Sequence, residues 1–163
     1  MVSLQAMGPT RFVLREQEYN TFLSALRRLR ASASAKAVFL VDKDGMLLAS
    51  TGETAEFDVT ALASLAAGNI AATGGLANLI GEKEFSILFH EGERDNMHIS
   101  VIGDRLILVV IFDSRSSVGL VRLRVRRVSE ELAQVLASAG EKAGEEEGLI
   151  EELTEEDIES LFC

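Results

Sequence analysis

Apolar residues recur along the chain at two different spacings, which distinguish its helical segments from its extended ones. In residues 16–32 they lie three or four positions apart with arginines between them, and this spacing predicts an amphipathic helix. Short apolar runs bounded by turn residues then predict five strands. These runs occupy residues 36–42, 46–51, 85–91, 97–102 and 105–112.

Two further helices complete the predicted set. One spans residues 58–80, with Asp58 as its N-cap and Gly81 at its end. Residues 121–126 alternate like a strand, but over residues 116–138 six apolar residues at helical spacing favour a helix. The element order is therefore α-β-β-α-β-β-β-α. We expect an α/β (α+β) sandwich in which a five-stranded antiparallel sheet carries helices on both faces, with the wholly apolar run at 105–112 as a central strand.

Charge is distributed unevenly and suggests how the chain is divided. The net charge of −10 comes almost entirely from residues 139–163, which hold ten acidic residues and one basic residue. Glycines and glutamates at the start of that segment are typical of a flexible, self-repelling linker. We predict a flexible N-terminal segment at 1–15, one domain at 16–138 and an acidic flexible tail at 139–163.

Composition also limits the partners and the location. A negative net charge disfavours nucleic acid as a partner. The uncharged stretch 59–81 is long enough to cross a bilayer, but it is rich in alanine and contains Thr60, Ser64 and Asn69, so we expect no membrane insertion. The single cysteine, Cys163, fits a reducing, cytoplasmic compartment.

No catalytic chemistry is evident in the sequence. There is no phosphate-binding or dinucleotide-binding glycine motif. The two histidines, His90 and His98, fall on separate predicted strands and are expected to be surface polar residues, because no ligand cluster surrounds them. We therefore expect no catalytic residue, no metal and no cofactor, and we interpret the chain as an interaction protein.

The helix predicted at 58–80 is unusual because no face of it is charged. An exposed face normally carries charged residues, and each internal glycine costs about 1 kcal/mol relative to alanine, so we expect another backbone to approach closely. The alternative is a helix buried on all sides within one domain. We expect Leu62, Leu65, Leu76 and Ile80 to sit on the sheet. A flank suited to a second copy of the chain consists of Ala63, Ile70, Gly74 and Ala77. The face suited to a different partner consists of Thr60, Ser64, Ala67, Gly68, Ala71, Gly75 and Asn78.

Several segments give the chain a family resemblance. They are VFLVDKDGMLLAS at 38–50, TALASLAAGNIAATGGLANLIGEKEF at 60–85, FHEG at 89–92, RLILVVIFD at 105–113 and SVGLVRLRVRR at 117–127. Together with the element order, they closely resemble the bacterial, MglB-type members of the roadblock/dynein light-chain family. The resemblance covers about residues 12–138.

This resemblance implies a function and partners. It implies a homodimer with a continuous sheet, which could assemble further into a dimer of dimers, and a Ras-like small GTPase of the MglA type as partner. The implied activity is GTPase activation in cell polarity and motility, at a cell pole, without an arginine finger, by repositioning the GTPase's own residues. The alternative is a scaffold that binds a GTPase or motor subunit without accelerating hydrolysis.

The acidic tail is a second candidate for partner binding. Ile158, Leu161 and Phe162 are apolar residues that a short helix would place on one side. The competing interpretation is a tail that only confers solubility.

Overall fold

The computed structural model describes the backbone of residues 14–151 and the side chains of residues 14–140. Three helices and five strands follow one another in the predicted order. They are α1 (Glu16–Ala33), β1 (Ala37–Asp42), β2 (Leu47–Gly52), α2 (Val59–Leu79), β3 (Ile87–Glu91), β4 (Asn96–Ile102), β5 (Leu106–Phe112) and α3 (Val118–Glu151).

All strands pair antiparallel in a single sheet of order β2-β1-β5-β4-β3. The sequence prediction of a five-stranded antiparallel sheet is confirmed. Strand β5 is central, and all seven of its residues are buried, as its apolar run predicts. Strands β2 and β3 form the two edges of the sheet.

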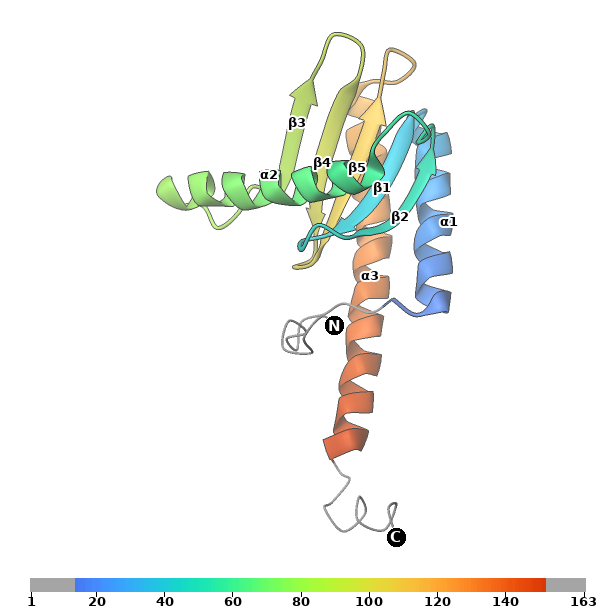
Figure 1. Cartoon of the computed structure of the whole chain (residues 1–163), viewed down its shortest axis with the longest axis vertical. Helices are drawn as coiled ribbons and strands as arrows, with labels where there is room; N and C mark the ends of the chain where they lie inside the picture. Colours follow the sequence, from blue (N-terminus) through green and yellow to red (C-terminus); the bar gives the residue numbers. More distant parts are fainter. Residues whose placement is uncertain (1–13, 152–163) are drawn as a thin grey trace.

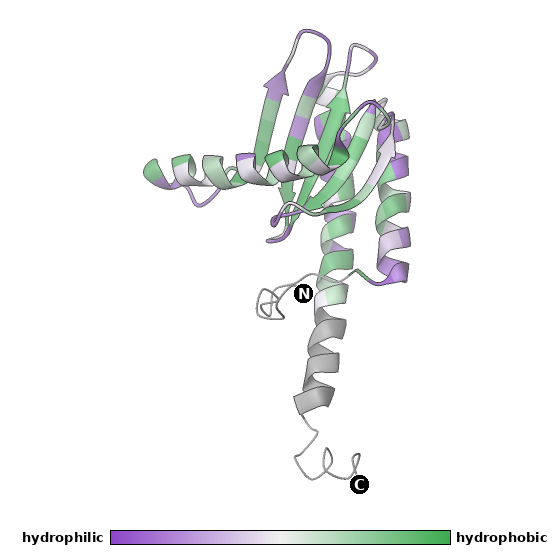
Figure 2. Cartoon of the chain, in the orientation of Figure 1, coloured by the Kyte–Doolittle hydropathy of each residue, from purple (hydrophilic) through white to green (hydrophobic). Residues whose placement is uncertain are grey.

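Helices cover both faces of the sheet, so the core is divided into two layers (Figure 1). Helices α1 and α3 pack on one face, where Phe22, Leu26 and Leu132 meet Leu108 and Val110. Helix α2 lies alone across the other face, on a layer of strand residues that belong mainly to β1 and β5. Figure 2 shows that the central strands β1 and β5 are mainly hydrophobic, whereas β3 and β4 include hydrophilic stretches.

The segments at the two ends differ in part from the predicted division. Helix α3 does not end near Ser138 but continues to Glu151, through the residues expected to form a flexible linker. Glutamate and alanine are good helix formers, and they outweigh the few glycines. Leu14, placed in the flexible N-terminal segment, packs against the core between α1 and α3. The division into domains is otherwise still a prediction, because residues 1–13 and 152–163 lie outside the described part.

Candidate protein-interaction surface

Helix α2 packs on the sheet through small residues. Asp58 caps its first turn by accepting a hydrogen bond from the Ala61 backbone N–H at 3.0 Å, as expected. The buried side chains that pack on the sheet belong to Ala63, Ala66, Ala67 and Ile70. Alanine methyl groups let the helix backbone come close to the strands, so this face needs no long side chains.

The expected seating of the helix on its leucines is wrong except at Leu62, which packs against the layer between α2 and the sheet. Leu65 is 73% exposed, Leu76 58% and Ile80 69%, while Leu62 is only partly buried. Leu79 is also exposed. The C-terminal half of α2 extends beyond the edge strand β3, so its large side chains have no strand beneath them (Figure 1). We call Leu65, Leu76, Leu79 and Ile80 the leucine face.

The flank expected to meet a second copy of the chain is also wrong, because most of its side chains are buried within their own chain. Ala63 and Ile70 are buried against the sheet of their own chain, at 0% and 5% exposure, and Ala77 is buried within its own chain at 0%. Their side chains therefore offer no surface to another chain. Of that predicted set, only Gly74 is partly exposed.

The face predicted to meet a different partner is almost entirely accessible. Only Ala67, at 8% exposure, belongs to the buried layer. We call the remaining residues the small-residue face. They are Thr60, Ser64, Gly68, Ala71, Gly75 and Asn78, all of which are exposed.

The hairpin between β1 and β2 borders the small-residue face. Asp42 accepts hydrogen bonds at Oδ1 from the backbone N–H groups of Asp44 and Met46, which fixes the turn. Gly45 has φ +93°, and a Cβ there would lie 3.3 Å from the Cα of Ser64. This close approach, together with the positive φ, explains the glycine in the turn.

A groove of about 440 Å³ runs beside the same face. Its floor is formed by α2 residues that include Ala71, Gly75 and Asn78, and its rim by Lys43 and Glu84. Lys43 Nζ lies 3.0 Å from a carboxylate oxygen of Glu84, so this charge is already paired. The groove presents backbone and small side chains that a partner can approach closely.

The glycines of α2 have no packing reason within the chain. A Cβ added to Gly68, Gly74 or Gly75 would meet no atom within 4 Å. Each glycine in a helix interior costs about 1 kcal/mol relative to alanine. Nothing in the described part of the chain therefore requires glycine at these positions, which suits a close approach by a partner.

Strand β3 is an open edge of the sheet beside α2. Among the described strands it pairs only with β4, and its Ile87 and Phe89 are 49% and 41% exposed. Asn69 of α2 donates a hydrogen bond to His90 Nε2 of this strand at 2.9 Å, which connects the helix to the edge. An edge strand with unpaired backbone groups is a template for strand addition. The sequence places 105–112 in the centre of the sheet but does not show which strands form its edges.

The histidines do not form a site together. His90 lies on the α2 side of the sheet, whereas His98 faces α3 and is only 1% exposed. The expectation that both are surface residues is wrong for His98, because the alternation in β4 places it under α3 and not in solvent. Among the residues that the structure describes, no group of three or more His, Cys, Asp or Glu side chains could hold a metal ion.

By length and composition alone, α2 is also a candidate membrane span. In the structure it packs on the sheet through its alanines. The polar residues of the small-residue face remain accessible next to the leucine face. This mixture of small polar and apolar side chains suits a protein partner.

A family model described as the Roadblock/LC7 domain matches residues 21–112. The solved structure of Myxococcus xanthus MglB is similar, with 51% identity and a TM-score of 0.75, over 78% of this chain and 96% of that one. The gliding protein MglB of Thermus thermophilus has 33% identity and a TM-score of 0.73, over 78% and 96% of the two chains. An MglB structure described as a tetrameric arrangement has 31% identity and a TM-score of 0.75, over 81% and 98%. No protein with a curated description matches the sequence.

Proposed function

Because this chain belongs to the Roadblock/LC7 family and MglB proteins are among its relatives, we propose that it regulates a Ras-like small GTPase of the MglA type as a GTPase-activating protein. The observation that carries the proposal is the small-residue face of α2. It is exposed and uncharged, and its glycines have no packing role in the chain. Such a face suits a partner whose backbone must come very close.

The regulator acts as a homodimer in this proposal. Two features support it: the open edge of β3 and the neighbouring leucine face of α2. Pairing two β3 edges would extend the sheet and satisfy backbone groups that are now unpaired. It would also bring two leucine faces together, and burying one leucine side chain contributes about 1.5–3 kcal/mol. A dimer of dimers is a further proposal, supported by the tetrameric arrangement described for one relative.

The proposed mechanism repositions the GTPase's own catalytic residues and uses no arginine finger. Arg115 is the first arginine to consider as a possible finger, because it lies in a loop. Its Nε lies 2.9 Å from Asp113 Oδ1, and its Nη2 lies 3.2 Å from a carboxylate oxygen of Glu53. The hydrogen bonds from Arg115 hold the pKa of the Asp113 carboxyl below its usual value. An arginine held by two carboxylates is poorly placed to insert into another active site.

Single-turnover GTP hydrolysis by an MglA-type GTPase tests this function. Arg94 is a second exposed loop arginine, between β3 and β4. We expect the chain to accelerate hydrolysis, and Arg94→Ala and Arg115→Ala to keep most of the acceleration. Losing an arginine finger would instead slow hydrolysis by about 10³–10⁵. If either alanine variant binds the GTPase but loses the acceleration, the proposed mechanism is wrong. If the wild-type chain binds without accelerating hydrolysis, the protein is a scaffold.

The proposed cellular role is the control of polarity and motility from the cytoplasm, with a cell pole as the place of action. The support is the description of the Thermus thermophilus relative as a gliding protein. The tail residues Ile158, Leu161 and Phe162 lie outside the described residues, and their partner-binding role is still a prediction.

A further inference from the structure

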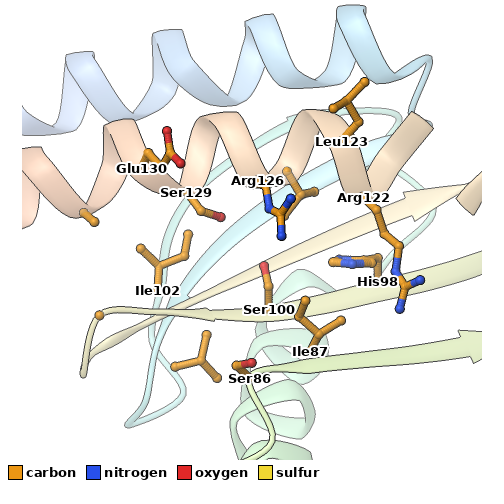
Figure 3. A pocket seen from close by; sticks show the side chains of 14 residues that line it. Ser86, Ile87, His98, Ser100, Ile102, Arg122, Leu123, Arg126, Ser129 and Glu130 are labelled. Atoms are coloured by element: carbon orange, nitrogen blue, oxygen red, sulfur yellow. The ribbon is translucent and has the colours of Figure 1, made fainter. Parts of the chain in front are cut away.

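A cavity of about 670 Å³ lies on the face of the sheet opposite α2, between strands β3 and β4 and helix α3. Small-molecule pockets typically enclose about 300–1,000 Å³ with mainly apolar walls. Here Ile87, Val101, Ile102, Val125 and Ala133 supply apolar wall. Figure 3 shows the side chains that converge on the space from β4 and α3.

Two buried polar side chains of β4 face this cavity without a partner. His98 and Ser100 are two positions apart, so they lie on the same side of the strand. They are 1% and 4% exposed, and neither ring nitrogen of His98 nor the Ser100 hydroxyl makes a hydrogen bond. Buried polar groups in proteins nearly always have partners. A ligand in the cavity would supply them.

Two arginines stand at the opposite wall. Arg122 and Arg126 are one turn apart on α3, and both side chains extend toward the cavity (Figure 3). Within the described side chains, no ion pair includes either of them. Burial, with a smaller contribution from Arg122, lowers the pKa of His98. Glu130 of α3 is the other charged residue that lines the cavity, and Glu91 lies at the end of β3.

We propose that this cavity binds a small organic anion, with a carboxylate or phosphate group on an apolar body. Arg122 and Arg126 pair with the anionic group, because arginine guanidinium groups form strong charge-assisted hydrogen bonds with both kinds of oxyanion. The apolar wall holds the body, and a small shift of the side chains around them lets His98 and Ser100, which are covered in this structure, hydrogen-bond its polar atoms. The negative charge of Glu130 repels the anion from the end of the cavity where Glu130 lies. This site is separate from α2 and does not depend on the proposed GTPase function.

Calorimetry on the full chain with four probes tests the site. The probes are 2-naphthoate, 2-naphthyl phosphate, the neutral isostere 2-naphthalenemethanol and inorganic phosphate. We expect at least one of the two naphthyl anions to bind roughly tenfold or more tightly than the alcohol and than phosphate. The tighter of the two shows whether the site prefers carboxylate or phosphate. The proposal would be overturned if the alcohol or inorganic phosphate bound as tightly as the naphthyl anions. It would also be overturned if neither naphthyl anion bound.

A matched pair of variants locates the bound anion. Arg126→Gln removes a charge at the cavity, and Arg127→Gln removes the same charge from the next position of α3, which does not line it. We expect roughly tenfold weaker binding of the naphthyl anion with Arg126→Gln and no change with Arg127→Gln. Equal weakening by both would show only a general charge effect and would contradict the site.

Histidine NMR gives an independent readout, since the chain has only two histidines. His90, on the other face of the sheet, is the internal reference. An anion next to Arg122 should shift the His98 ring signals and raise the pKa of His98, while the His90 signals stay in place. Binding that moves His90 and leaves His98 unchanged would place the ligand elsewhere.

Discussion

At the scale of single residues, the glycines of α2 are where stability and interaction are expected to conflict. Gly75 is exposed, and an added Cβ would meet nothing within 4 Å. Gly75→Ala should therefore raise the free energy of unfolding by about 0.5–1 kcal/mol, because alanine loses less backbone entropy in a helix. Urea unfolding of the two chains measures the difference. A destabilised Gly75→Ala would mean that the helix needs glycine for its own fold.

His98 should make stability depend on pH. Burial lowers its pKa in the folded state, so the unfolded chain binds a proton more readily. The charged groups facing it are Arg122, Arg126 and Glu130, with Glu91 at the end of β3. The free energy of unfolding should fall as pH drops below the unfolded histidine value of about 6.5.

Urea unfolding of a matched pair of variants between pH 7.5 and 5 measures that dependence. His98→Gln should flatten it, and His90→Gln should keep it. Equal slopes in all three chains would show that His98 does not cause the effect.

At the scale of elements, α3 combines a packing region with an extension. Its buried residues Val121, Val125, Val128 and Leu132 lie in the first half, and partly buried packing continues to Leu136. A chain ending at Ser138 keeps these contacts. We expect it to stay folded and dimeric, with a cooperative thermal transition. A monomeric or unfolded shortened chain would show that residues beyond Ser138 contribute to the core or to the interface.

The elements were predicted well because each has its own apolar period. Strand β5, apolar at every position, was placed correctly in the centre of the sheet. The orientation of α2 was predicted wrongly, since a helical wheel shows faces but not where the sheet ends. With the C-terminal half of α2 beyond β3, alanines pack inward and Leu76 stays exposed.

The candidate site was partly predictable from the sequence. The small-residue face follows from the absence of charge in α2, and only Ala67 of that set is buried. The cavity beside His98 was missed, because its walls come from β3, β4 and α3, which are distant in sequence. Polar residues at every second position, such as His98 and Ser100, are typical of a strand face in solvent. Only the position of α3 shows that this face is covered.

At the scale of the whole molecule, the proposed dimer depends on apolar surface that one chain leaves uncovered. Leu65→Glu places a charge in the leucine face, where the side chain is 73% exposed, so the fold of one chain should tolerate it. We expect light scattering to show the mass falling from two chains to one. The control is Leu123→Glu on α3, another exposed leucine but on the opposite face of the sheet. A Leu65→Glu variant that remains dimeric would rule out the leucine face as the interface.

We propose that the small-residue face of α2 binds a Ras-like GTPase and activates it. Gly75→Arg inserts a long charged side chain into that face, and Gly119→Arg makes the same change at an exposed site on α3 with open space around it. Burying an unpaired charge costs on the order of 3–5 kcal/mol, which is enough to abolish a micromolar complex. In single-turnover GTP hydrolysis with an MglA-type GTPase, Gly119→Arg should stimulate like the wild-type chain. Gly75→Arg should remain dimeric and lose the stimulation, whereas full stimulation by Gly75→Arg would show that this face of α2 does not bind the GTPase.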